Sequence, residues 1–308
     1  MKEDFNMLIA LVKRNSKIYF KDKMSFFLSL ITPLILVVLF ITFLKNAYVD
    51  SLLAAIPEGF ELSKKVIDGF TGGWLFSSIL GVSTVTISFC SNMIMATDKI
   101  NKNILDFNIT PVKKHIVALG YFISNFISTF IVCFIAMVVG FIYLAIVGWY
   151  LTFVDILLII ASMIISTLFG SLLSTIICSF LKSQGGVSAV STLVSSMYGF
   201  LSGAYMPLSQ SGEGLRTFVS FFPGTYGTLL FRRGFMRGPI EAMGKSIPAE
   251  VLNEIKVAFD FQFSVFNSEV GVGTMFLVLG LSSLVLFGVF MLVLNLRKKA
   301  KNKEVTKW

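Results

Sequence analysis

Six long apolar stretches without charged residues alternate with short charged stretches along the chain. Each apolar stretch is long enough for a helix that crosses a bilayer, which takes about 20 residues. The pattern therefore predicts one all-α integral membrane domain over residues 1–308. Its six transmembrane helices are expected at about 25–44, 72–96, 117–142, 156–181, 185–206 and 272–296.

The first charged stretch, residues 1–24, repeats apolar residues near the period of an α-helix. Its apolar stripe consists of Phe5, Leu8, Ile9, Val12 and Tyr19. Most of its basic residues lie off this stripe, which predicts an amphipathic interfacial helix leading into the first span. Two interpretations stay open, because such a helix could lie only on the membrane surface or could also contact a cytoplasmic partner.

The long connection at 208–271 predicts further helices on the opposite side. Residues 215–231 are too apolar for a solvated loop, and Pro223-Gly224 would interrupt a helix there. A re-entrant or interfacial hairpin fits, since irregular backbone at membrane depth must be covered by protein. Residues 249–267 predict an amphipathic outer helix with one apolar side formed by Val251, Leu252, Ile255, Phe259 and Phe263.

Composition agrees with a membrane protein, since 55% of the residues are hydrophobic and only 14% are charged. The net charge of +9 is spread over the segments that flank the apolar stretches, so it indicates topology and not nucleic-acid binding. Seventeen Lys and Arg fall on the side of the two termini and nine on the other. The positive-inside rule therefore predicts a multi-pass protein of the plasma membrane with both termini in the cytoplasm.

Catalytic, metal-binding and nucleotide-binding patterns are missing from the sequence. The three cysteines lie in apolar stretches without ligand spacing, and the single histidine, His115, flanks a predicted span. Residues 238–246 resemble a phosphate-binding loop but have five residues between the glycines instead of four, and contain Pro239. We therefore expect a chain that is not an enzyme and has no ATP site. The predicted spans also lack the interior charges typical of ion-coupled carriers.

Small and weakly polar residues line one face of the second predicted span and one face of the fifth. The two series are Ser77, Gly81, Thr84, Ser88 and Ser91, and Ser188, Thr192, Ser195, Gly199 and Ser202. Such faces allow close helix packing, and their hydroxyls can also line a path for a polar group. Both interpretations stay open. The candidate path residues are Ser77, Thr84, Ser88, Asn92, Thr192, Ser195, Tyr198 and Gly199.

A short basic segment, residues 98–115, separates the second and third predicted spans. Pro111 disfavours helix at Thr110, so a short helix around 99–109 should end there. The apolar residues of this helix are too few to anchor a domain but suit a groove on a partner. A structured cytoplasmic turn on the membrane is the alternative.

These features together resemble the membrane subunit of a type-2 ATP-binding-cassette exporter. The matching motifs are Asp98-Lys99, Asp106-Phe107, Thr110-Pro111-Val112-Lys113, the Ser-Gly-Ala-Tyr-Met-Pro stretch at 202–207, Phe221–Tyr226 and Arg232-Arg233. The chain departs from the family at Lys102, where many relatives have Gly, and at Leu105, where many have Glu.

The resemblance implies that residues 98–115 form the cytoplasmic coupling helix that docks onto a separate ATPase subunit. The implied docking residues are Asp98, Lys99, Lys102, Ile104, Leu105, Asp106, Phe107, Thr110 and Pro111. ATP and Mg²⁺ would bind the ATPase, and a second permease copy, identical or related, would enclose a path between the second and fifth helices.

The expected function is ATP-driven export of an amphipathic or lipophilic small molecule, drug, peptide or lipid. The partners implied are the ATPase, the second permease and membrane lipid, without nucleic acid. An ATP-independent carrier or channel is the main alternative, and a membrane-embedded enzyme has little support.

Overall fold

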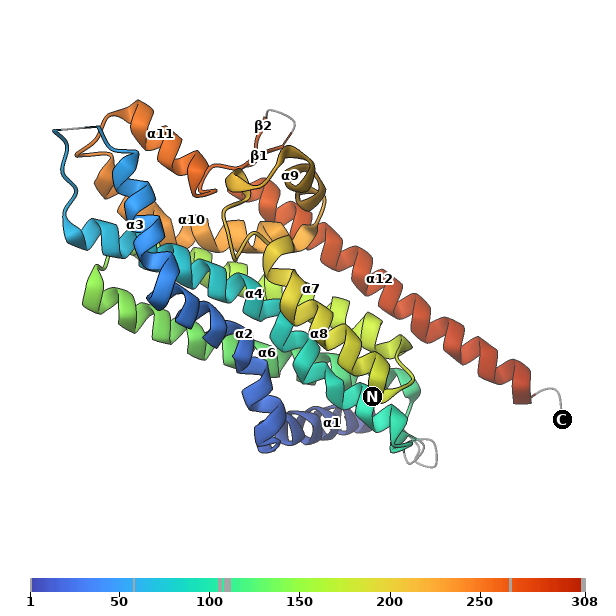
Figure 1. Ribbon diagram of the computed structural model, residues 1–308. Helices are drawn as coiled ribbons and strands as arrows, with labels where there is room; N and C mark the ends of the chain where they lie inside the picture. Colours follow the sequence, from blue (N-terminus) through green and yellow to red (C-terminus); the bar gives the residue numbers. More distant parts are fainter. Residues whose placement is uncertain (1, 58, 105–106, 108–111, 266–267, 306–308) are drawn as a thin grey trace.

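The computed structural model describes residues 2–57, 59–104, 107, 112–265 and 268–305 and is almost entirely helical (Figure 1). The sheet within these residues is a two-stranded antiparallel hairpin formed by β1 (Ser264–Val265) and β2 (Ser268–Glu269). The longer helices are α1 (Lys2–Lys21), α2 (Lys23–Leu39), α4 (Lys64–Ile100), α6 (Lys114–Val147), α7 (Phe153–Phe180), α8 (Gln184–Leu201), α10 (Pro223–Met243) and α12 (Val272–Val305). The shorter elements are a π-helical stretch η1 (Phe40–Leu44), α3 (Lys45–Ala54), η2 (Leu208–Gln210), α9 (Glu213–Ser220) and α11 (Ala249–Ala258).

Five helices among the described residues are long and apolar enough to cross a membrane. They are Ser29–Ala54, Lys64–Ile100, Lys114–Val147, Phe153–Phe180 and Val272–Leu296. They coincide with five of the six predicted spans, and an all-α membrane protein is confirmed to that extent. The remaining prediction, 185–206, corresponds to α8, which ends at Leu201 and contains several Ser, Thr and Gly residues among its apolar ones. The count of six spans is therefore not confirmed.

The central helix of the bundle is α4, which packs against α2, α6, α7, α8 and α10 (Figure 1). In its most apolar stretch 83% of the residues are buried, compared with 17% in α12. Small residues make this burial possible, because they let neighbouring backbones approach closely. A Cβ on Gly73 would lie 2.8 Å from the carbonyl oxygen of Phe235, and one on Gly81 would overlap the side chain of Thr228. Both contacts join α4 to α10.

Several helices extend beyond the uncharged stretches from which they were predicted. The helix expected at 72–96 begins at Lys64 and continues to Ile100. Its first turns contain Asp68, whose carboxylate pairs with Lys45 of α3 at 2.9 Å. A charged turn outside the apolar layer does not end a helix, so absence of charge predicts the apolar core of a helix better than its ends.

The N-terminal segment predicted to form an amphipathic interfacial helix is the helix α1, which packs against α6 near the end of α4. The face turned toward the bundle consists of Leu11, Asn15 and Tyr19. Phe5 and Ile9, assigned to the same stripe from the sequence, are instead 61% and 49% exposed. The apolar stripe therefore covers two faces of α1, one against protein and one away from it.

The connection at 208–271 folds into α9, α10, α11 and the hairpin. The predicted interruption is present, because α9 ends at Ser220 and α10 begins with Pro223 in its first turn. The expectation of one outer helix over 249–267 is wrong. The helix α11 ends at Ala258, and Asp260 turns the chain with a left-handed φ of 53°.

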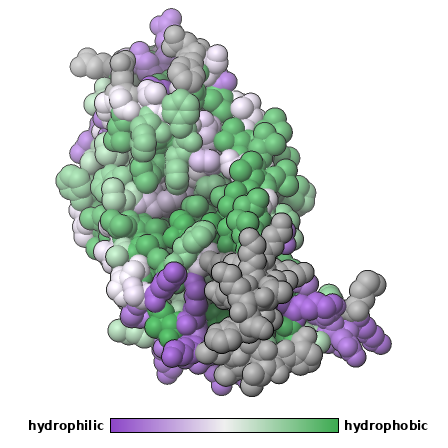
Figure 2. Space-filling view, turned by 90° about the vertical axis from the view of Figure 1, so that its right-hand side faces the viewer, coloured by the Kyte–Doolittle hydropathy of each residue, from purple (hydrophilic) through white to green (hydrophobic). Residues whose placement is uncertain are grey.

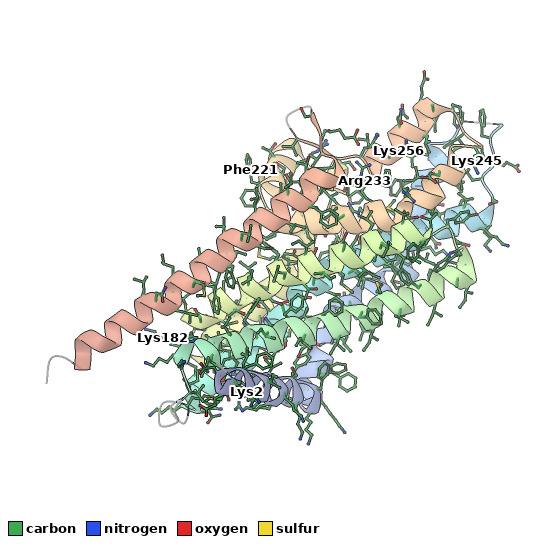
Figure 3. The ribbon with its side chains drawn as sticks, turned by 180° about the vertical axis from the view of Figure 1, so that it is seen from behind. Lys2, Lys182, Phe221, Arg233, Lys245 and Lys256 are labelled. Carbon is green, nitrogen blue, oxygen red and sulfur yellow. The ribbon has the colours of Figure 1, made fainter. Side chains whose placement is uncertain are left out.

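Charged residues gather at the two ends of the bundle. Hydrophobic side chains cover the middle of the face in Figure 2, and hydrophilic ones lie toward its top and bottom. Figure 3 shows Lys2 and Lys182 at one end and Arg233, Lys245 and Lys256 at the other. We call these the α1 end and the α11 end.

Candidate functional site

The carboxylate of Asp98 joins three segments at the α1 end. Asp98 is 6% exposed and lies in the last turn of α4. Its Oδ2 accepts hydrogen bonds from Arg14 of α1 at 2.7 Å and from the Tyr121 hydroxyl of α6 at 2.6 Å, and its Oδ1 accepts one from Asn103 at 3.0 Å. We call these four residues the Asp98 cluster.

Arg14 extends the Asp98 cluster toward the predicted coupling segment. Its guanidinium also donates to the side chain of Asn15 at 2.8 Å and lies 5.6 Å from the centre of the Phe107 ring. The hydrogen bond with Asp98 raises the pKa of Arg14, so the guanidinium stays charged. One cation therefore contacts both the end of α4 and an aromatic residue of the segment that follows it.

Lys99 joins the same end of α4 to the end of α7. Its ammonium donates to the carbonyl oxygens of Ser179 and, at 3.0 Å, Leu181. Carbonyls at a helix C-terminus lack intrahelical donors, and a basic side chain can satisfy them. Asp98 and Lys99, both predicted to dock a partner, thus have contacts inside the chain that fix the start of the segment.

The backbone turns sharply at Lys102, just after α4. Its φ of 62° lies in the left-handed region, where a side chain is strained and Gly is favoured. The continuous helix expected around 99–109 is therefore wrong at its start, because α4 ends at Ile100 and the turn at 101–103 separates it from Ile104. The departure from the family at Lys102 falls on this strained position.

Of the remaining predicted docking residues, Lys102 is exposed and Ile104 and Phe107 are half-buried. Leu105, Asp106, Thr110 and Pro111 lie outside the described residues. Where the chain is described again, Lys113 pairs with Asp4 of α1 at 2.8 Å. This hydrogen bond lowers the pKa of Asp4. The segment is thus tied to α1 near both of its ends, by Arg14 and by Asp4.

The candidate path residues of α4 have buried side chains within the chain. Ser77 and Thr84 donate to carbonyl oxygens of α4 itself, those of Trp74 at 2.7 Å and Gly81 at 3.0 Å. The other two reach neighbouring helices. Ser88 lies 3.3 Å from the hydroxyl of Thr129 and 3.4 Å from that of Ser171, and Asn92 donates to Thr175 at 3.0 Å. This polar face of α4 contributes to packing against α6 and α7.

The candidate path residues of α8 divide into two groups. Tyr198 and Gly199 are buried, and a Cβ on Gly199 would overlap the ring of Tyr205. Thr192 and Ser195 instead line an open groove of about 830 Å³ between α8, α4 and α2. Of the eight candidate path residues, Thr192 and Ser195 line this groove and the other six do not.

The groove has two chemically different walls. On one side α8 contributes hydroxyl groups, including those of Ser188 and Ser191. On the other, α2 and η1 contribute apolar side chains, including Ile31, Leu39 and Phe43, which are 44%, 44% and 67% exposed. Such a groove fits a molecule, or a second helix surface, that is apolar on one side and weakly polar on the other.

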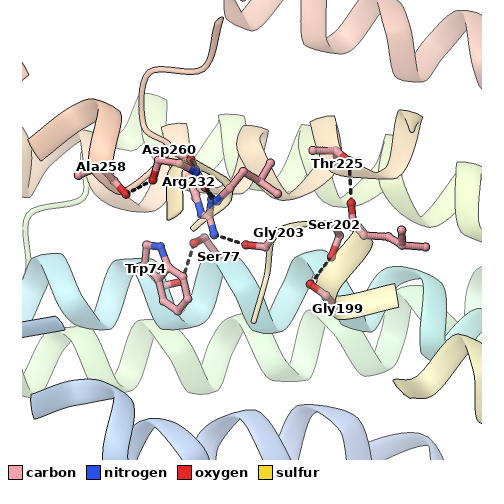
Figure 4. A network of polar contacts seen from close by, with 12 residues as sticks. Trp74, Ser77, Gly199, Ser202, Gly203, Thr225, Arg232, Ala258 and Asp260 are labelled. Carbon is pink, nitrogen blue, oxygen red and sulfur yellow. Dashed lines mark hydrogen bonds and ion pairs between the residues drawn. The ribbon is translucent and has the colours of Figure 1, made fainter. Parts of the chain in front are cut away.

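A buried ion pair at the α11 end was not predicted from the sequence. Arg232 of α10 donates to Asp260 at 2.7 Å and to the carbonyl oxygen of Gly203, and lies 5.1 Å from the centre of the Trp74 ring (Figure 4). The Asp260 carboxylate also accepts from the backbone amides of Leu208, at 2.5 Å, and Ser209, at 3.0 Å. The two charges are 28 residues apart in the sequence, and no periodic pattern connects them. We call this the Arg232 cluster.

The part of the chain that the structure describes contains no cluster of three or more His, Cys, Asp or Glu side chains that could hold a metal ion. The stretch that resembled a phosphate-binding loop begins inside α10. A Cβ on Gly238 would overlap the carbonyl oxygen of Tyr150, so this glycine serves close packing. Its helical backbone does not offer a loop of amides to a phosphate.

Comparison with protein families matches residues 6–236 to the family described as ABC-2 type transporter. Comparisons with curated proteins and with solved structures gave no significant match. The matched range covers about three quarters of the chain and includes most of α1, the Asp98 cluster, the groove and most of α10. The family's domain is a transmembrane permease domain and not an ATPase. The chain therefore belongs to the ABC-2 type transporter family and is a membrane subunit of an ABC-type transporter.

Proposed function

We propose that this chain is the permease of an ATP-driven exporter that moves an amphipathic or lipophilic small molecule, drug, peptide or lipid out of the cell. A separate soluble ATPase, with its own ATP and Mg²⁺, would supply the energy. The Asp98 cluster is the observation that carries this proposal. It joins the segment after α4 to α1 and α6, and Lys99 joins the end of α4 to α7. A force on the segment would therefore act on α1, α4, α6 and α7 together.

The docking surface would be the segment from Lys102 to Pro111. Asp98 and Lys99 would position it through their contacts inside the chain, while Lys102, Ile104 and Phe107 would reach the partner. Leu105, Asp106, Thr110 and Pro111 are proposed for the same surface on the sequence motif alone. A half-buried apolar side chain flanked by a cation suits an apolar groove with an acidic rim.

The substrate path would lie between the second and fifth helices of two permease copies, identical or related. Thr192 and Ser195 support this best, because they face the open groove opposite the apolar wall of α2. The buried residues Ser77, Thr84, Ser88 and Asn92 would form the wall behind it, together with Tyr198 and Gly199. A path with one hydroxyl wall and one apolar wall favours amphipathic cargo.

The α1 end would face the cytoplasm, with both termini on that side of the plasma membrane. The excess of Lys and Arg in the segments at this end supports this orientation. The connection at 208–271 would then lie on the outer side, with α9 and α10 as its re-entrant part. Its Pro223 break and its deep packing against α4 support that assignment.

The test is purification of the tagged full-length chain from its native membrane, with ATP hydrolysis measured and co-purifying proteins identified by mass spectrometry. We expect a soluble subunit with a phosphate-binding loop. Phe107→Ala should reduce its recovery by about tenfold, the effect of losing roughly 1.4 kcal/mol of contact energy. The matched control is Phe60→Ala at the α11 end, which is 44% exposed and should leave recovery unchanged.

Two results would count against the proposal. Equal ATPase recovery in the Phe107 and Phe60 variants would remove the segment from the docking surface. Transport of a fluorescent lipid analogue by the chain alone in liposomes without ATP would favour the carrier. Export also requires ATP-dependent movement of cargo away from the ATPase side, which inside-out vesicles measure.

A further inference from the structure

We propose that α1 carries a binding surface for anionic lipid headgroups, formed by Lys13, Lys17 and Lys21 and an adjacent apolar strip. This surface is separate from the face of α1 that packs on the bundle, where Leu11, Asn15 and Tyr19 are buried. The proposal goes beyond ATP-driven export, because it concerns a lipid headgroup bound on the surface of α1 and not the transported molecule. It holds for any cargo and for either direction of transport.

The first observation is a row of exposed cations. Lys13, Lys17 and Lys21 follow each other at intervals of four residues, so they lie along one side of the helix. All three are exposed, and within the described residues none of them forms an ion pair. By contrast Arg14, the neighbouring cation, is occupied by Asp98. Among the described residues, the row is therefore free of protein anions.

The second observation is an apolar strip next to the lysine row. Phe5 is 61% exposed, Ile9 49% and Phe20 37%. At 100° per residue the three side chains fall on the arc of α1 between the bundle-facing side and the lysines. A helix with a cationic row beside an exposed apolar strip suits the boundary between headgroups and acyl chains, where it can insert the strip and keep its charges at the phosphates.

The third observation identifies the occupant as lipid, because the strip continues onto a membrane helix. The ring of Phe20 lies 6.1 Å from that of Phe26, which lies 6.2 Å from that of Phe27 at the start of α2. Phe27 and Met24 are 62% and 71% exposed, and α2 belongs to one of the five apolar spans. A protein partner would need no such continuity with the lipid-facing surface, whereas a lipid that contacts α2 extends its headgroup toward α1. The charge of that headgroup must be negative to match three lysines.

The test uses native mass spectrometry of the full-length chain in detergent with an equimolar mixture of phosphatidylglycerol and phosphatidylcholine. We expect the chain to retain phosphatidylglycerol in excess. The triple variant K13Q, K17Q, K21Q should lower the ratio of bound phosphatidylglycerol to phosphatidylcholine by about fivefold or more, because each lysine near an anionic surface contributes about that factor to affinity. Raising NaCl from 0.05 to 0.5 M should reproduce the change in the wild type.

The matched control removes the same number of exposed lysines from the α11 end, in the variant K64Q, K65Q, K245Q. It should keep the wild-type ratio. Equal ratios in the wild type and the α1 variant would overturn the proposal. Loss of the ATPase with an unchanged lipid ratio would also overturn it and would assign the lysine row to the protein partner. Since lipid retention is measured without ATP, its outcome is independent of the export hypothesis.

Discussion

The Asp98 cluster and the Arg232 cluster lie at opposite ends of the bundle, and solvent reaches the ion pair of only the first. In the Asp98 cluster the side chain of Arg14 is 35% exposed, while that of Asp98 is 8% exposed. In the Arg232 cluster the two side chains are 0% and 3% exposed. Both pairs have N–O distances of 2.7 Å, so the difference is in burial and not in geometry.

The difference in burial predicts different mechanical roles. When the Asp98 pair opens, water can solvate Arg14 again, so the segment after α4 can change its position at moderate cost. Opening the Arg232 pair would leave two charges without water, which is far more costly. The Arg232 cluster also fixes the turn after α8, through Gly203 and the amides of Leu208 and Ser209. We expect the α1 end to be the adjustable end and the α11 end the rigid one.

Replacing Asp260 with Asn should give the largest effect and tests the rigid end. The substitution keeps the shape of the side chain but leaves Arg232 buried without a counterion. We expect a loss of about 3–5 kcal/mol in the free energy of unfolding. The measurement is reversible unfolding of the purified chain in mixed micelles, with thermal melting in nanodiscs as a second readout.

The control is the double variant Arg232→Met, Asp260→Asn, in which the buried cation is removed as well. It should recover most of the stability lost in Asp260→Asn, because no uncompensated charge remains and Asn keeps an acceptor oxygen for the backbone amides at 208 and 209 and tolerates the left-handed φ. If Asp260→Asn were as stable as the wild type, water would have to reach this pair, and the contrast between the two ends would disappear.

Replacing Asp98 with Asn should cost less and tests the adjustable end. Arg14 loses its counterion but keeps access to water, and the Tyr121 hydroxyl keeps an acceptor in the amide oxygen. We expect a loss of about 1–2 kcal/mol, within the range for disrupting a hydrogen-bonded group. Hydrogen exchange should rise at 99–104 and stay unchanged at 203–209. Equal exchange at both sites would show that the two ends respond as one unit.

Tyr121→Phe tests the same carboxylate, that of Asp98, with a smaller expected effect. It removes one donor and leaves the Arg14 pair intact, so the loss should be about 1 kcal/mol. A larger effect for Tyr121→Phe than for Asp98→Asn would mean that the hydroxyl, and not the ion pair, fixes the segment.

The sequence predicted the apolar cores of five helices, because hydropathy reports directly on contact with lipid. It also predicted the break at Pro223, because a proline disfavours helix at the residue before it, and Phe222 is extended. It did not settle α8, whose Ser, Thr and Gly residues fit either packing or a solvated wall. The structure divides those residues between Gly199, buried under Tyr205, and Thr192 and Ser195, which face the groove.

The Arg232 cluster could not be predicted for a different reason. Arg232 and Asp260 meet only because α10, the turn after α8 and the end of α11 converge on one point. Such a meeting depends on the packing of several elements, and neither residue stands in a periodic pattern. The start of the predicted coupling segment was mispredicted on similar grounds. The effect of a proline on the residue before it can be recognised in the sequence, whereas the turn at Lys102 is not marked by Gly or Pro.

Replacing Lys102 with Gly should give the smallest effect and the opposite sign. The φ of 62° costs a side-chain-bearing residue roughly 1–2 kcal/mol, and part of this is offset by the greater freedom of Gly in the unfolded chain. We expect a gain of about 0.5–1 kcal/mol in the free energy of unfolding. The same unfolding measurement applies, and hydrogen exchange at 101–104 should slow.

The neighbouring substitution Asn101→Gly is the matched control for Lys102→Gly. Asn101 has a φ of −76°, which any residue adopts, so Gly there adds only unfolded-state freedom and should lower the stability slightly. Opposite signs at two adjacent positions would show that backbone strain, and not the loss of a side chain, produces the gain. A loss of stability in Lys102→Gly would mean that the left-handed turn is not strained. In that case the access of solvent to Arg14 would be the only reason for the α1 end to be adjustable.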